Sequence, residues 1–153
     1  MIVETARFGL IDVEQSSIIS MPRGMFGFED STEYCLIQHG PDNAYMWMQS
    51  TADPGLAFVV VDPSQYFSDY AFMLSSVEAE YLDLNTPNDA MVLTTVNIEP
   101  GTLEVTANLA GPVVINSKSL LAMQVALDDE RYGTKQVIVG LSDTIGDEFP
   151  KAA

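Results

Sequence analysis

The fold is decided by residues 58–74, which read FVVVDPSQYFSDYAFML. The stretch begins as a valine-rich apolar run, which is typical of a buried β-strand. The strand is expected to end at Asp62 and Pro63, because proline has no backbone N–H with which to extend a β-ladder. Asp62 is placed to cap the next turn of the chain, and Pro63 can occupy the first turn of a short helix. The stretch therefore predicts a core strand that stops abruptly and gives way to an aromatic segment.

Runs of strand length recur on both sides of this stretch, separated by turn signals. The further strand candidates are IVETARFG, LIDVEQ, SIIS, YCLIQH, YMWMQS, AMVLTTVNI, LEVTANL, PVVINS, LLAMQVAL and KQVIVGL. The glycines of PRGMFGFED predict unusual backbone angles or a bulge. SSVEAEYLDL instead predicts a short helix, because Ser75 and Glu78 have capping-box spacing.

We therefore expect a mainly β fold, an antiparallel β-barrel or barrel-like sandwich with one or two short helices. A single domain is expected over residues 1–141, followed by a loosely held acidic tail at 142–153.

The charge of the chain is strongly negative, with 22 acidic and 6 basic residues giving a net charge of −16. Between Arg23 and Lys118 there is no lysine or arginine. Phosphate backbones and anionic membrane surfaces both need cations on the protein, so neither is an expected direct partner. A basic protein would be attracted and steered by this field. The excess of acid could equally serve solubility alone.

The sequence predicts a cytoplasmic protein. Glu4 stands where a secretory signal would carry basic residues. The apolar run LAFVVV is far shorter than the ~18 residues that a membrane helix needs. Cys35 is the single cysteine and cannot form an internal disulfide, which fits a reducing compartment.

No catalytic constellation is apparent. Cys35 and His39, the single thiol and imidazole, share one predicted strand, where four residues span about 13 Å. They supply neither a nucleophile–base pair nor a typical zinc site. The acidic clusters at 128–130 and 143–148 lack calcium-loop spacing, and no glycine-rich phosphate loop occurs. We expect no enzyme, metal or cofactor; a small-ligand or flavin-binding β-barrel is the alternative, although a flavin phosphate favours cations that the central sequence lacks.

Five motifs occur in an order that resembles the FliW family of flagellar assembly factors: PRGMFGFED, YMWMQS, DPGLAFVVVDPSQYFSDYAF, TANLAGPVVINSK and VALDDERYGTK. The resemblance spans residues 2 to 136. It implies a mainly antiparallel β-barrel that acts as a non-enzymatic regulator. It further implies that the protein binds CsrA, a translational repressor of flagellin mRNA, and antagonises it, with flagellin as the competing partner. The chain departs from the family pattern at 119–124, where SLLAMQ replaces a polar, basic turn.

The aromatic segment after Asp62 has two interpretations. Its rings could close the end of the barrel, or part of their surface could stay exposed beside an acid, which is typical of interface hot spots. On the second interpretation, Tyr70→Ala would weaken partner binding and leave the fold intact. The predicted partner surface consists of Tyr66, Phe67, Asp69, Tyr70 and Glu78.

Overall fold

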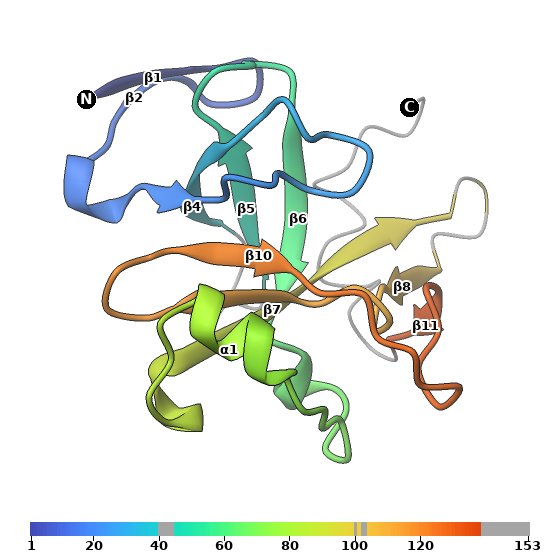
Figure 1. The fold of residues 1–153 in the computed structure, drawn as a ribbon. Coiled ribbons are helices and arrows are strands. Elements are labelled where there is room, and N and C mark those ends of the chain that lie inside the picture. Colours follow the sequence, from blue (N-terminus) through green and yellow to red (C-terminus); the bar gives the residue numbers. More distant parts are fainter. Residues whose placement is uncertain (40–44, 100, 102–103, 139–153) are drawn as a thin grey trace.

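The computed structural model describes residues 1–39, 45–99, 101 and 104–138. The expected mainly β, antiparallel fold is confirmed (Figure 1). The expected domain end at residue 141 and the tail at 142–153 lie outside the described residues and stay predictions.

The strands are β1 (Ile2–Thr5), β2 (Gly9–Asp12), β3 (Ile19–Ser20), β4 (Glu33–His39), β5 (Tyr45–Ser50), β6 (Ala57–Val61), β7 (Ala90–Ile98), β8 (Val105–Ala107), β9 (Val113–Asn116), β10 (Ala122–Gln124) and β11 (Gln136–Val137). One α-helix, α1 (Ser76–Tyr81), and three 3₁₀ turns, η1 (Gln15–Ser17), η3 (Pro63–Gln65) and η4 (Pro87–Asp89), complete the described elements.

Nine strands form one sheet in the order β10-β9-β7-β6-β5-β4-β3, from which β8 and β11 branch beside β7, while β1 and β2 form a separate hairpin. The sheet curls strongly, so that β5 and β6 cross β7 and β10 at a steep angle in Figure 1. Its two ends meet where the Ser20 N–H donates to the Leu120 carbonyl at 3.0 Å. The curled sheet is thus a half-barrel whose two ends are joined at this point, rather than an open plane.

Strand β7 holds the sheet together, because it pairs with three other strands. Its first four residues pair with β9, Thr94 and Thr95 pair with β6, and Val96–Ile98 pair with β8. The ladder between β6 and β7 contains only two residue pairs, because β6 ends at Val61 and Pro63 follows. The predicted strand end at Asp62 and Pro63 is therefore confirmed, and it leaves the beginning of β7 without β6 beside it.

The central strands are buried on both faces, which explains why the valine run does not alternate with polar residues. Val59 and Val61 of β6 belong to one apolar cluster, together with Trp47 of β5. Val60 belongs to a second cluster on the opposite face, together with Met48 of β5. Successive side chains of this run therefore pack alternately in the first and the second apolar cluster.

A third apolar cluster lies between α1 and the strands β9 and β10. Leu82, directly after α1, packs with Val114 and Met123. Asn116 ties the same elements together: its side-chain amide donates to the Leu82 carbonyl at 2.8 Å, and its carbonyl oxygen accepts from the Lys118 N–H at 2.9 Å. The predicted capping box at Ser75 and Glu78 is confirmed at the start of α1.

The unusual turn at 119–124 is where the barrel closes. Leu120 has a positive φ of 62° and its carbonyl receives the bond from Ser20. Its half-buried side chain packs against the second apolar cluster, and Ala122 and Met123 enter β10. The apolar residues that replace a polar turn here are thus used in packing.

The loop PRGMFGFED generates our first prediction. Gly24 and Gly27 both have positive φ angles, 66° and 86°, as the sequence predicted for this loop. A Cβ at Gly24 would also lie 2.6 Å from the Glu29 Cα, whereas a Cβ at Gly27 would meet nothing within 4 Å. We expect Gly27→Ala to lower the free energy of unfolding by about 1 kcal/mol through backbone strain alone. Gly24→Ala should lower it by about 3 kcal/mol, because overpacking is added.

Urea denaturation of the two variants measures this difference. Gly133→Ala serves as the control, because its Cβ would enter open space and its φ is not in the left-handed region. Equal losses at Gly24 and Gly27 would show that the close approach to Glu29 does not constrain the loop.

Candidate functional site

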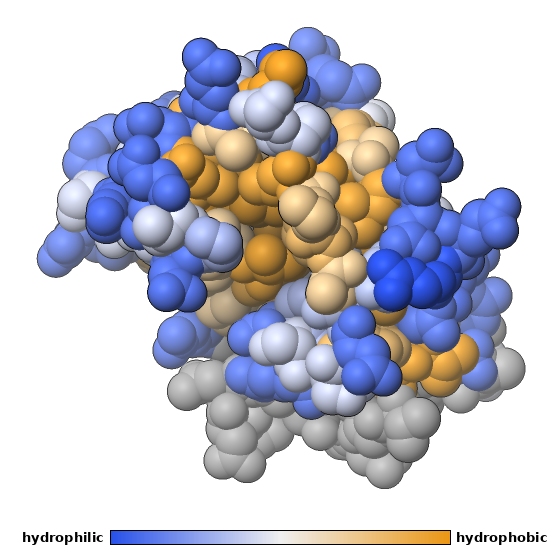
Figure 2. All heavy atoms as spheres, turned by 60° about the horizontal axis from the view of Figure 1, so that its bottom comes forward, coloured by the Kyte–Doolittle hydropathy of each residue, from blue (hydrophilic) through white to orange (hydrophobic). Residues whose placement is uncertain are grey.

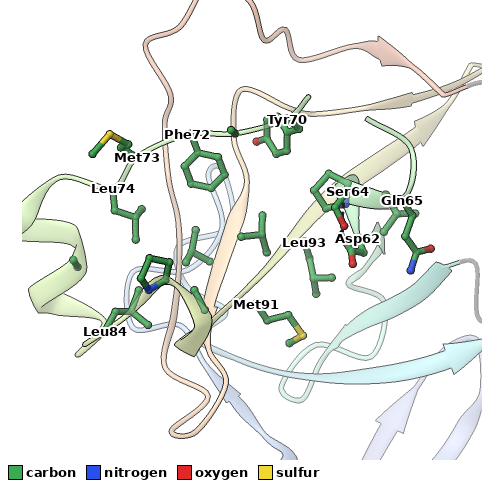
Figure 3. A pocket seen from close by; sticks show the side chains of 18 of the residues that line it. Asp62, Ser64, Gln65, Tyr70, Phe72, Met73, Leu74, Leu84, Met91 and Leu93 are labelled. Carbon is green, nitrogen blue, oxygen red and sulfur yellow. Dashed lines mark hydrogen bonds between the residues drawn. The ribbon is translucent and has the colours of Figure 1, made fainter. Parts of the chain in front are cut away.

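A groove with a volume of about 940 Å³ lies between the chain that follows β6, the helix α1 and the start of β7. Figure 2 shows it as a hollow of apolar side chains bordered by hydrophilic residues. Met91 and Leu93 of β7 lie at its floor, and Tyr70 and Phe72 form one wall (Figure 3). Leu84 lies on the side next to α1, and Pro87 also belongs to the lining. Among the described lining residues, Asp62 is the one with a charge.

The wall made by residues 62–74, which we call the 62–74 segment, begins with local hydrogen bonds. The Asp62 carboxylate accepts from the Ser64 N–H at 3.0 Å and from the Ser64 hydroxyl at 2.7 Å. Pro63 stands at the start of η3, as the sequence predicted, and it is buried. The Phe67 N–H donates to the Pro63 carbonyl at 2.8 Å. These contacts turn the chain away from the sheet directly after β6.

Two tyrosines fasten the same segment further on. The Tyr70 hydroxyl donates to the Leu109 carbonyl at 2.7 Å, and its ring meets the Tyr132 ring edge-on at 4.7 Å. The Tyr132 hydroxyl accepts from the Ala71 N–H at 3.0 Å. Burial raises the pKa of the Tyr70 phenol strongly, and the neighbouring Tyr132 raises it further. Tyr70 therefore stays neutral and keeps its hydrogen bond across the physiological range.

The predicted partner surface is only partly brought together. Tyr66 and Phe67 are half-buried and pack against the first apolar cluster. Asp69 is exposed, and Tyr70 lines the groove. Glu78 is half-buried, and its carboxylate accepts from the Ser75 N–H at 2.9 Å in the capping box. Tyr70 is the member of this set that contributes to the groove, and the others lie outside its lining.

Sequence reasoning missed several groove residues. Met73 is 92% exposed at the rim although it is apolar, and Leu74, Leu84 and Met91 complete the apolar lining with Phe72. A signal was present in the run AFML at 71–74, which follows a strand breaker and does not have the period of a strand. The contribution of β7 was not visible, because its residues read as an ordinary core strand.

Acidic residues flank the groove lining in the sequence. Asp69, Glu80 and Asp83 each stand next to a lining residue, and Asp62 is itself part of the lining. Two cations in this part of the fold are engaged: Arg23 lies over the Tyr81 ring at 4.2 Å, and Lys118 pairs with Asp89 at 3.3 Å. In the described part of the chain, the groove lining therefore contributes the single negative charge of Asp62 to an otherwise uncharged surface, and the chain beside several lining residues is acidic.

The described residues contain no group of three or more His, Cys, Asp or Glu side chains arranged to hold a metal ion. Cys35 is a core residue and packs with Val3 and Ile18. Burial raises the pKa of its thiol, which disfavours the reactive thiolate. Across the described part of the chain, no helix is long and apolar enough to cross a membrane.

Tyr70 generates the second prediction. Tyr70→Phe removes the partly buried hydrogen bond to Leu109 and should lower the free energy of unfolding by about 1 kcal/mol. Tyr70→Ala also removes the ring from between Phe72 and Tyr132 and should cost about 3 kcal/mol. Thermal or urea denaturation measures both, with Phe26→Ala as the control, because Phe26 is 55% exposed. A Tyr70→Ala variant as stable as the parent would mean that the ring is free to serve a partner, which is the second of the two interpretations that the sequence allows.

Comparisons with known proteins agree with the fold. The sequence profile of the family described as FliW protein matches residues 2–138. The flagellar assembly factor FliW of Geobacter sulfurreducens is 40% identical over 135 residues, which cover 88% of this chain and 84% of the relative. That of Treponema pallidum is 37% identical and covers 91% of this chain and 92% of the relative. A crystal structure of the flagellar assembly factor FliW superposes with a TM-score of 0.82 at 28% identity, covering 90% of this chain and 96% of the other. The chain therefore belongs to the FliW family.

Proposed function

We propose that this protein acts in flagellar assembly as a non-enzymatic, cytoplasmic regulator. In this proposal it binds a CsrA-type translational repressor and relieves the repression of flagellin mRNA. Flagellin competes for the protein, so that free flagellin releases the repressor. Membership of a family whose relatives are named flagellar assembly factors supports the role in assembly. The two partners are those implied by the resemblance of the sequence motifs.

The observation that carries the proposal is the apolar groove, with Asp62 in its lining and hydrophilic residues at its border (Figure 2), on a chain of net charge −16. Exposed apolar patches rimmed by polar residues mark interaction sites in soluble proteins. The negative field would attract and orient a basic repressor over about one Debye length, ~8 Å at physiological salt. Apolar contact then contributes the affinity, and the acidic residues increase the rate of association.

A second candidate function is the binding of an apolar small molecule. The groove volume of about 940 Å³ lies within the range of known small-molecule pockets, roughly 300–1,000 Å³. The lining disfavours a flavin, because Asp62 is its one charged residue within the described chain and would repel a phosphate. Native mass spectrometry and the visible absorbance of the purified protein separate the two functions, since a bound ligand adds mass and a flavin adds a yellow band.

Calorimetric titration with the CsrA-type repressor of the same organism provides the third prediction. We expect a saturable complex whose affinity falls when the salt concentration rises, because the acidic field is screened. Prior addition of flagellin should abolish the heat of binding. Absence of binding to either partner at low salt would contradict the proposed function.

A further inference from the structure

We propose that a partner inserts an extended peptide segment into the groove, where the segment adds a β-strand to the open edge of β7. This inference rests on the proposed function and identifies the surface and the chemistry of the bound segment. The segment would carry apolar side chains toward the groove floor and lysine or arginine residues beside them.

The register of β7 shows which of its backbone groups are open. The Ser117 N–H donates to the Asp89 carbonyl at 2.8 Å, in the same register as the ladder between β7 and β9. Backbone groups of an antiparallel strand alternate between its two sides. Asp89, Met91 and Leu93 therefore bond toward β9, whereas the backbone of Val92 points to the opposite side, where β6 would lie.

Strand β6 does not reach Val92. Its last pair with β7 joins Val61 to Thr94. Two residues further along the same register, Val92 would face Pro63, which has no N–H and has already entered η3. The Ala90 N–H is used, because it donates to the Pro87 carbonyl at the end of η4. Within the described residues, the N–H and carbonyl of Val92 thus form an unpaired sheet edge.

This open edge lies in the groove itself. Ala90 and Val92 belong to its lining, together with the residues from Val61 to Gln65, over which the chain leaves the row of β6 and enters η3. Figure 3 shows the end of β6 and Asp62 on one side of the cavity and Leu84 on the other, with β7 passing between them. A peptide lying in this gap would occupy the row that β6 vacates. Its backbone would bond Val92, and alternate side chains would enter the apolar floor.

The negative charge near the groove favours a partner segment that carries lysine or arginine. Asp62 stands at one end of the gap, and Asp69, Glu80 and Asp83 are each adjacent in the sequence to a lining residue. No described lining residue is cationic, and Lys118 is paired with Asp89. An acidic peptide would be repelled, whereas a peptide with lysine or arginine beside its apolar residues would be held at both the rim and the floor.

Amide hydrogen exchange by NMR tests the mode of binding, with the CsrA-type repressor and flagellin each as the probe. We expect the Val92 N–H to exchange at least tenfold more slowly in the complex. The N–H groups of Ala90, Met91 and Leu93 should change less, because they are already bonded within the protein. Unchanged exchange at Val92 in a saturated complex would overturn the strand-addition proposal, and a helix or small molecule in the groove would give that result.

A matched pair of variants tests the location. Met73→Lys places a charge at the groove rim, and Leu10→Lys places the same charge on the β1–β2 hairpin, at the opposite end of the molecule from α1 (Figure 1). The two residues are 92% and 72% exposed, so both variants should fold. Met73→Lys should weaken partner binding about tenfold, while Leu10→Lys leaves it unchanged.

Different results would contradict the groove inference and the proposed function. If the parent protein binds both partners but the Val92 exchange and the Met73→Lys affinity are unaltered, the groove inference is wrong and the proposed function stands. If the parent protein binds neither partner, the proposed function itself is wrong.

Discussion

The structure depends on how β7 is paired along its length. One strand of nine residues bonds successively to β9, β6 and β8, and so joins the curled sheet to the branch that carries β11. The pairing with β6 is cut short by Pro63, because a proline in the ladder would remove a hydrogen bond and its ring would not fit a central strand. The same residue that ends β6 therefore opens the sheet beside Val92 and turns the chain into the groove wall.

The aromatic residues after this break stabilise the fold of the free protein, whether or not a partner is bound. Tyr70 bonds Leu109, and Tyr132 bonds the backbone at Ala71, so the 62–74 segment is held to the loop after β8 and to the chain before β11. With the segment held in this way, Met73 stays exposed and Leu74 reaches the third apolar cluster. The groove is thus maintained by contacts on its outer side, and its inner side remains apolar and accessible.

Local rules in the sequence predicted local structure well. The predicted strand end, 3₁₀ turn and capping box are all present in the structure. They depend on contacts between residues at most three positions apart, made by Asp62, Pro63, Ser75 and Glu78. The positions of YMWMQS and AMVLTTVNI as β5 and β7 agree equally well with apolar runs bounded by turn signals. Family motifs over most of the chain identified the family before the fold was known.

The groove could not be predicted in the same way, because residues far apart in the sequence form it. Spacing places Tyr66, Phe67 and Tyr70 near one another but does not say which ring faces the core. In the structure all three pack against the first apolar cluster, and Tyr70 also lines the groove. The open edge at Val92 depends on the register between β6 and β7, which no local pattern encodes. Leu120 likewise has a role in closing the barrel that is apparent only once Ser20 is beside it.

The central claim is that the groove beside β7 is where the protein meets its partners. Site-specific photocrosslinking tests it most directly, with the same photoreactive amino acid placed in turn at Met73 on the rim and at Phe26 on an exposed loop outside the groove lining. The account predicts that the probe at Met73 crosslinks to the CsrA-type repressor, that flagellin suppresses this product, and that the probe at Phe26 gives none. Crosslinking from Phe26 with none from Met73 would place the partner elsewhere and contradict the account.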